Sequence, residues 1–190
     1  MHPSTFEKRR RARGFTLVEL LTVVVIVGIL ATLGIVGLRE HVFASRTAEA
    51  LAMIQSIRIA EERWKAENMV YLNVSSSASS WYPADPRADT TRIKRNFFTS
   101  AGAHPDDAAW KALKPTVTGP VEFGYMVNAG PPDQTMTTPA ITVPNWSGWT
   151  PQGEYWYVIQ AIADFDHDQL PAYFLASSLK ADIYRQDEGE

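Results

Sequence analysis

Two short stretches of this 190-residue chain combine residue types and spacings that suit chemistry. The first is Gly14–Glu19, where the carboxylate of Glu19 stands inside the start of an apolar run. The second contains Asp164, Asp166 and Asp168, three carboxylates at alternate positions beside an expected turn. The four histidines lack metal-binding spacing, and the sequence has neither a Gly-x-Ser-x-Gly elbow nor a phosphate-binding loop. We therefore expect that the chain is not an enzyme.

The aspartate group has two interpretations. Clustered carboxylate oxygens are the ligands that a hard cation such as calcium prefers, which makes Asp164, Asp166 and Asp168 candidate metal ligands. An EF-hand loop beginning at Asp164, however, requires glycine and glutamate where this chain has Gln169 and Leu175. Aspartate is also an ordinary turn residue. An acidic hairpin turn therefore remains the alternative to a calcium site, and no other cofactor is expected.

Glu19 is the only charged residue between Phe15 and Leu38. A helix of about 20 apolar residues crosses a hydrocarbon core about 30 Å thick, so this run can span a bilayer. A carboxylate at the centre of such a span costs about 2.5 kcal/mol or more, and it calls for a partner. Cleavage after Gly14 would create one, a new ammonium on Phe15. The alternative is that Glu19 lies near the membrane boundary and points to water.

Charge is distributed unevenly along the chain, with a basic cluster at Lys8–Arg13 and an acidic body. Basic residues beside a span favour retention on the cytoplasmic side, which places the remainder across the membrane. An ordinary secretory signal has a small-residue cleavage site after its apolar part, but here Arg39-Glu40-His41 follows. The span is therefore either a simple signal anchor or a segment retained after cleavage at Gly14. The acidic body argues against nucleic-acid binding.

The helical pattern continues beyond the span, because residues 39–69 contain neither proline nor glycine. An apolar stripe recurs there at helical spacing: Phe43, Ala50, Ile54, Ile57 and Trp64. The charged residues, including Glu49, Arg58 and Arg63, are expected on the opposite side. We divide the chain into a leader at 1–14, a transmembrane half-helix at 15–38, an amphipathic half-helix at 39–69 and a head at 70–190.

Within the head, the serine-rich stretch 73–90 is expected to be a surface loop rather than core. A short helix is predicted around Asp106–Leu113, and strands follow. Their expected positions are Pro120–Ala129, Glu154–Phe165, Pro171–Leu179 and a last short strand at Ile183-Tyr184. The fold class is thus α+β, a long N-terminal helix packed on a small C-terminal antiparallel sheet. An aromatic group either packs in this core or forms an adhesive patch: Trp146, Trp149, Tyr155, Trp156 and Tyr157.

The segment RARGFTLVELLTVVVIVGILATLGIVG resembles the N-terminal signature of type IV pilins and of the pseudopilins of type II secretion. The block Gly28-Ile29-Leu30-Ala31 lies midway along it, as in the family. The resemblance implies that a prepilin peptidase cuts between Gly14 and Phe15 and methylates the new amine of Phe15. It also implies that Glu19 neutralises that amine, on a neighbouring subunit, as the span joins a helical filament.

The resemblance implies a structural subunit of a type IV pilus. Its partners would be the prepilin peptidase, other pilin subunits and an inner-membrane assembly platform. The precursor would be a single-pass inner-membrane protein, and the assembled form an extracellular pilus. One alternative is a pseudopilin in a periplasmic pseudopilus, and a remote one is a membrane-anchored periplasmic enzyme.

The chain departs from the family's pattern in two places. Many pilins have proline where this chain has Val36, so Gly34 and Gly37 are expected to supply a kink or local melting instead. There is also no cysteine for the disulfide that closes many pilin heads. Some pseudopilins use calcium where disulfides are missing, which adds to the interest of the aspartate group.

Overall fold

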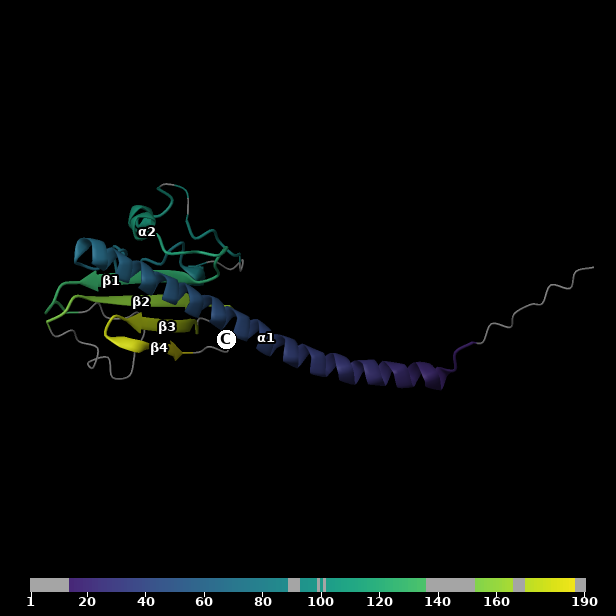
Figure 1. Ribbon diagram of the computed structural model, residues 1–190. Helices are drawn as coiled ribbons and strands as arrows, with labels where there is room; N and C mark the ends of the chain where they lie inside the picture. The colour runs from purple at the N-terminus through teal and green to yellow at the C-terminus, as the bar shows by residue number, and fades with distance from the viewer. Residues whose placement is uncertain are drawn as a thin grey trace, which may run out of the picture. The chain divides into compact units, whose positions relative to one another are not determined.

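The computed structural model describes residues 14–88, 93–98, 100, 102–135, 153–165 and 170–186. Its helices are α1 (Leu17–Asn68), the 3-10 turn η1 (Pro86–Ala88) and α2 (Asp107–Leu113). Its strands are β1 (Gly124–Gly130), β2 (Trp156–Ala163), β3 (Ala172–Ser177) and β4 (Lys180–Gln186), as Figure 1 shows. The chain divides into two compact units, Met1–Val42 and Phe43–Glu190. The predicted α+β class is confirmed.

In the first unit, α1 presents an apolar surface to its surroundings. The stretch Leu17–Ile35 comprises 19 residues and is long and apolar enough to cross a membrane. None of this stretch is buried within the protein, so its side chains need lipid or other helices around them. The hydroxyls of Thr22 and Thr32 donate to the carbonyls of Val18 (2.6 Å) and Gly28 (2.9 Å), which satisfies both polar groups inside the helix.

The glycines near the end of this stretch do not interrupt the helix. The backbone of α1 is helical from Leu17 to Asn68, including Gly34 and Gly37. The expectation of local melting there is therefore wrong for this structure. A glycine is compatible with helical dihedral angles and destabilises a helix interior by only about 1 kcal/mol, a cost that a long helix tolerates.

In the second unit, the sheet is an antiparallel meander in the order β1-β2-β3-β4. The part of α1 that belongs to the second unit, from Phe43 to Asn68, lies across one face of this sheet (Figure 1). We call this part the head half of α1. Ala50, Ile54 and Ile57 of the predicted stripe are fully buried against it, and Trp64 packs at the edge of the core. The sheet contributes residues from β1, β2 and β3: Tyr125, Val127, Ile159, Ala161, Phe174 and Ala176. The predicted stripe is confirmed from Ala50 to Trp64, whereas Phe43 is half-buried and outside this core. The first three predicted strands are confirmed.

The other face of the sheet is buried as well, which the sequence did not indicate. Met126 and Ile162 pack there with Trp81 and Tyr173. The chain between α1 and α2 therefore wraps around the β1 edge, with Trp81 on the far face and its neighbour Tyr82 in the core beneath α1. Both side chains are at most 2% exposed, so the expectation of a surface loop throughout 73–90 is wrong.

The wrap depends on close approach between two backbones. Tyr82 and Tyr125 exchange two hydrogen bonds, at 2.9 and 2.7 Å, which pair the wrapping segment with β1. A Cβ on Gly124 would lie 2.8 Å from the carbonyl oxygen of Ala84 and 2.8 Å from the Cδ of Pro86. Only glycine fits at this position without displacing the wrapping segment.

Several charged residues of α1 form hydrogen bonds to the loops around the sheet instead of pointing into water. Arg58 donates through Nη1 to the carbonyl of Ala181 (2.8 Å) and through Nη2 to that of Lys180 (3.0 Å), at the β3–β4 turn. Arg63 donates to the carbonyl of Leu113 at the end of α2 (2.5 Å). The expectation that such residues lie opposite the stripe is wrong, because long side chains on its flanks reach the loops around the core.

The strand β4 is longer than predicted. It begins at Lys180, although only Ile183-Tyr184 was expected to be strand. Its first three residues, Lys180, Ala181 and Asp182, are exposed because β4 is an edge strand, and they lack the apolar alternation that marks a half-buried strand. The turn before it is tied to α1 by Arg58, which no local pattern reveals.

We expect Arg58→Ala to lower the free energy of unfolding of the head by about 2–3 kcal/mol, because two charge-assisted hydrogen bonds are lost. Denaturant unfolding of the full chain in detergent, followed by tryptophan fluorescence, measures the change. Gln55→Ala is the matched control, as Gln55 is exposed on the same helix. Equal midpoints for Arg58→Ala and the unaltered chain would contradict the anchoring role.

Candidate functional site

The start of α1 is a capping box built from Thr16 and Glu19. The backbone N–H of Glu19 donates to the hydroxyl of Thr16 (3.2 Å). In return, Oε2 of Glu19 accepts from the backbone N–H (3.3 Å) and the hydroxyl (3.0 Å) of Thr16. The carboxylate therefore lies at the positive end of the helix dipole with local hydrogen-bond donors. This contact supplies hydrogen bonds but no countercharge.

The peptide bond between Gly14 and Phe15 precedes the helix. Gly14 is exposed, and the side chain of Phe15 is 77% exposed. A Cβ on Gly14 would meet no atom within 4 Å, and its backbone does not adopt the positive φ that favours glycine. The fold of this chain therefore does not require glycine at this position. If glycine is required at position 14, the requirement comes from a partner protein that recognises this segment and not from the fold.

The aspartate group is only partly within the described residues. Asp164 follows the last residue of β2 and is 7% exposed. Asp166 and Asp168 lie outside the described residues. Within the ranges that the structure describes, no group of three or more His, Cys, Asp or Glu side chains is placed to hold a metal ion. The calcium site at Asp164, Asp166 and Asp168 stays a prediction.

The aromatic group of the sequence analysis is also only partly within the described residues. Trp156 and Tyr157 are 2% and 3% exposed, and they pack in the core on opposite faces of β2. Tyr155 is half-buried beside them. Core packing therefore accounts for Trp156 and Tyr157. Trp146 and Trp149 lie outside the described residues, and an adhesive role for them stays a prediction.

A serine, an aspartate and a histidine meet near the start of α2, in a pattern that invites comparison with a hydrolase. The hydroxyl of Ser80 donates directly to Oδ2 of Asp106 (2.6 Å), and the backbone N–H of Ser76 donates to Oδ1 (3.1 Å). Nδ1 of His104 accepts from the backbone N–H of Asp106 (3.1 Å). A catalytic triad needs the histidine between serine and aspartate. This cluster instead ties the serine-rich loop to α2.

Glu61 is a buried carboxylate that the sequence analysis missed. It is fully buried in the core, where Oε2 accepts from the backbone N–H of Leu72 (2.9 Å). Oε1 has no hydrogen-bond partner among the described residues. Burial raises its pKa from 4.5 to about 8, opposed by the Leu72 N–H and assisted by the charge of Glu62. The spacing Ile57, Glu61, Trp64 places it in the apolar stripe, which is the signal that could have found it.

The protonation of Glu61 makes the head's stability depend on pH. Its pKa is about 8 when folded and 4.5 ordinarily, so the folded head binds the proton more tightly than the unfolded chain. The stabilising effect is complete below pH 4.5 and is lost as pH rises through about 8. We expect Glu61→Gln to remove this loss, and to be more stable than the unaltered chain by roughly 2–4 kcal/mol above the folded pKa.

Denaturant unfolding from pH 5 to pH 9 measures this effect. The amide of glutamine keeps an acceptor for the N–H of Leu72 without a charge. Glu67→Gln is the control, because Glu67 is exposed on the same helix and its change should leave the pH profile as it is. A profile for Glu61→Gln that still falls as steeply as that of the unaltered chain would contradict the assignment.

Comparison with known proteins addresses the N-terminal stretch. Residues 9–35 match the family model of the prokaryotic N-terminal methylation motif, which is the signature of type IV pilins and pseudopilins. This match confirms the resemblance seen in the sequence. No curated protein and no solved structure matches the chain.

The matched region contains the capping box, the exposed Gly14–Phe15 bond and the apolar stretch of α1. Together with the α+β head, the motif supports a membrane-anchored precursor of the pilin-like or pseudopilin type. The motif implies processing by a prepilin peptidase and assembly with other pilins, and it points to a structural subunit.

Proposed function

We propose that this chain is a structural subunit of an extracellular type IV pilus, cut between Gly14 and Phe15 and polymerised through α1. The observation that carries the proposal is the N-terminal motif, with Glu19 near the start of the apolar and exposed stretch Leu17–Ile35 of α1. The precursor is held in the inner membrane by α1, with its basic leader on the cytoplasmic side. Its partners are the peptidase, an inner-membrane assembly platform and further copies of the chain.

Processing creates a positive charge that can pair with the Glu19 carboxylate. Hydrolysis of the Gly14–Phe15 bond consumes one water and leaves a carboxylate on Gly14 and a primary amine on Phe15. A methyl group then moves to that amine from a sulfonium methyl donor, which leaves as a neutral thioether, and the amine releases one proton. The product still accepts a proton to become an ammonium. The exposed bond and the absence of a structural need for glycine at position 14 support a peptidase that recognises this segment.

Assembly pairs the two charges. Among the residues that the structure describes, Glu19 accepts hydrogen bonds from the neutral donors of Thr16 and pairs with no cation. In an apolar helical bundle an unpaired charge is strongly unfavourable, so the ammonium of Phe15 on a neighbouring copy is the natural partner. The two residues are four positions apart, about 6 Å along a helix at about 1.5 Å per residue. The pair therefore sets an axial shift between neighbouring copies.

We expect Glu19→Gln to be processed normally but to reduce the yield of fibres about tenfold or more, because breaking a buried ion pair costs about 3–5 kcal/mol. Glutamine keeps an acceptor for Thr16, so this variant preserves the capping box and removes only the charge. Sheared fibres and processed protein are quantified from the same cells.

Thr22→Val is the matched control. In the part of the chain that the structure describes, the Thr22 hydroxyl bonds only to carbonyls of its own helix, so this variant should assemble normally. Normal fibre yield from Glu19→Gln would show that Glu19 serves only as a helix cap. It would contradict the proposed pairing of Glu19 with the Phe15 ammonium of a neighbouring copy.

A deletion strain separates a pilus from a secretion pseudopilus. We expect loss of surface fibres and of surface motility, with the yield of secreted proteins unchanged. Expression of the unaltered chain from a plasmid should restore the fibres. Loss of secretion alone would overturn the proposal in favour of a pseudopilin of type II secretion.

A further inference from the structure

A short surface segment follows α1 in the head. Residues 69–73 leave the helix at Met69, whose φ of +64° is left-handed. Every one of these residues is exposed or half-buried, so the segment forms part of the outer surface. Its last residue, Asn73, accepts through Oδ1 from the backbone N–H of Ala129 in β1 (3.1 Å). We call residues 69–73 the strap, because they connect the end of α1 with the edge of the sheet.

Few backbone hydrogen bonds hold the strap in place. The N–H of Met69 donates to the carbonyl of Lys65 (2.7 Å), which closes the last turn of α1. The next backbone-to-backbone bond comes only at Ser75, whose N–H donates to the carbonyl of Val127 (2.8 Å). Among the residues that the structure describes, residues 70–74 make none. A surface segment with so few backbone bonds can open while the rest of the domain stays folded.

Ionisable side chains of α1 hold the strap instead. Oε2 of Glu61 accepts from the backbone N–H of Leu72 (2.9 Å). The hydroxyl of Tyr71 donates to Oε1 of Glu62 (2.9 Å) and accepts from Nζ of Lys65 (3.1 Å). Glu61 is fully buried, whereas Glu62 is exposed. The contact between Leu72 and Glu61 is therefore the inner tie of the strap.

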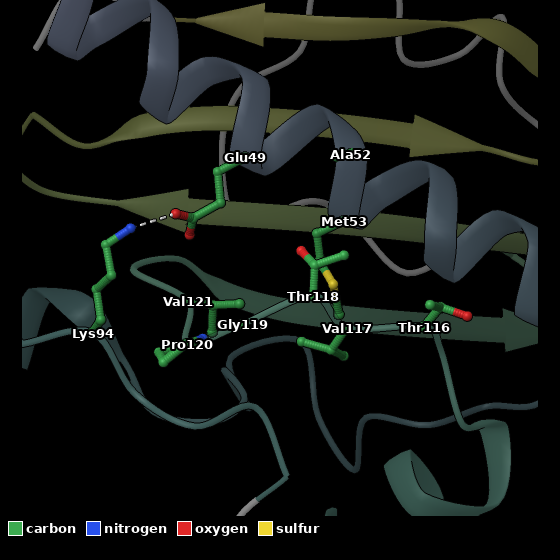
Figure 2. A pocket seen from close by; sticks show the side chains of 10 residues that line it. All are labelled: Glu49, Ala52, Met53, Lys94, Thr116, Val117, Thr118, Gly119, Pro120 and Val121. Carbon is green, nitrogen blue, oxygen red and sulfur yellow. Dashed lines mark hydrogen bonds and ion pairs between the residues drawn. The ribbon is translucent and has the colours of Figure 1, made fainter.

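Glu61 lacks the countercharge that another glutamate of the head half of α1 has. Figure 2 shows Glu49 at the side of an open groove, where its Oε2 pairs with Nζ of Lys94 at 3.0 Å. Within the described ranges, Glu61 pairs with no cation. A carboxylate that is buried without a countercharge is strongly unfavourable, so the group retains a proton. The closed strap therefore requires the neutral form of Glu61.

The described side chains around Glu61 do not offset a negative charge. The cations at helical spacing from it are Arg58 and Lys65, three residues before and four after. Arg58 donates to carbonyls of the β3–β4 turn, and Lys65 binds the hydroxyl of Tyr71. The titratable groups that interact with the Glu61 charge are acidic: Glu62 on α1, Tyr71 on the strap and Tyr157 on β2.

We infer that Glu61 is a proton-controlled latch: the strap is closed while Glu61 is protonated and opens when Glu61 ionises. The carboxylate is stable only in water, and water reaches it when the strap moves away from α1. Opening separates the rings of Tyr71 and Tyr157, which meet edge-on in the closed strap with their centroids 4.7 Å apart. The latch acts within one chain, so it does not depend on assembly.

The direction of the pH effect follows from the two environments of Glu61. Burial raises its pKa to about 8 in the closed strap, whereas the ordinary value is 4.5. The closed strap therefore binds the proton more tightly than the open strap does. The population of the open strap is expected to increase about tenfold per pH unit from pH 4.5 to about pH 8 and to level off above it.

Hydrogen exchange tests the latch at the amide that Glu61 holds. The full chain in detergent is followed at single amides by NMR from pH 5 to pH 9. After correction for intrinsic base catalysis, we expect the protection of the Leu72 amide to fall about tenfold per pH unit up to about pH 8. Glu61→Gln should show constant protection, because glutamine keeps an acceptor but cannot ionise. Urea at about 1 M should leave this exchange unchanged but accelerate that of Ile159 in β2, since a local opening exposes little surface.

Tyr71→Phe is the matched variant. It removes the hydrogen bonds to Glu62 and Lys65 and leaves Glu61 in place. We expect the Leu72 amide of this variant to be less protected at every pH, with the same dependence on pH as in the unaltered chain.

Protection of Leu72 that stays constant with pH in the unaltered chain would overturn the latch. A pH dependence that persists in Glu61→Gln, or that disappears in Tyr71→Phe, would overturn it as well. Equal exchange rates and equal urea dependence for Leu72 and Ile159 would show that the whole head unfolds and that the strap does not open on its own.

Discussion

The carboxylate of Glu19 in an apolar helix is the constraint on which the behaviour of the whole chain depends. Thr16 gives it hydrogen bonds but no positive charge. An ionised carboxylate in apolar surroundings is stable only with a partner, and we propose that an amine created at Phe15 is that partner. Under the proposed function, the precursor in lipid lacks this partner, and assembly with another copy supplies it. On this account, α1 is a polymerisation surface that the membrane holds until assembly.

The head meets a second requirement, which is to stay folded without disulfides. Polar side chains of α1 supply the necessary ties to the surrounding loops. Arg58 and Arg63 bind carbonyls at the β3–β4 turn and at the end of α2, and Glu61 accepts from the chain that follows the helix. Glu49 accepts from the backbone N–H of Glu122 (2.8 Å). The helix proposed to form the fibre therefore also holds the head together.

The elements that a local pattern determines could be predicted from the sequence. The apolar span, the stripe of Ala50, Ile54 and Ile57, and the strands β1, β2 and β3 follow from periodicity alone. The wrap that buries Trp81 could not, because a serine-rich stretch gives no sign that two of its aromatic residues straddle a sheet edge. The hydrogen bonds from Arg58 to the β3–β4 turn could not be predicted either, because they join residues far apart in the sequence.

The candidate site likewise contains some residues that the local sequence reveals and others that only the folded structure reveals. Gly14, Phe15 and Glu19 are recognisable because the chemistry of a charge in an apolar run is local to the sequence. The reciprocal bonds of Thr16 with Glu19 match a capping-box spacing, yet their meaning appears only with the geometry of the helix start. Glu61 was missed because a glutamate within an apolar stripe is easily assigned to the solvent side, and only tertiary packing reveals its burial.

The mass of the mature chain tests the central claim most directly. The protein is purified from fibres or membranes, and its N-terminal peptide is identified by mass spectrometry. The account predicts a chain that begins at Phe15 and carries one added methyl group on its α-amine. A chain that begins at Met1, or at any residue other than Phe15, would contradict the claim that α1 is released for assembly by cleavage after Gly14.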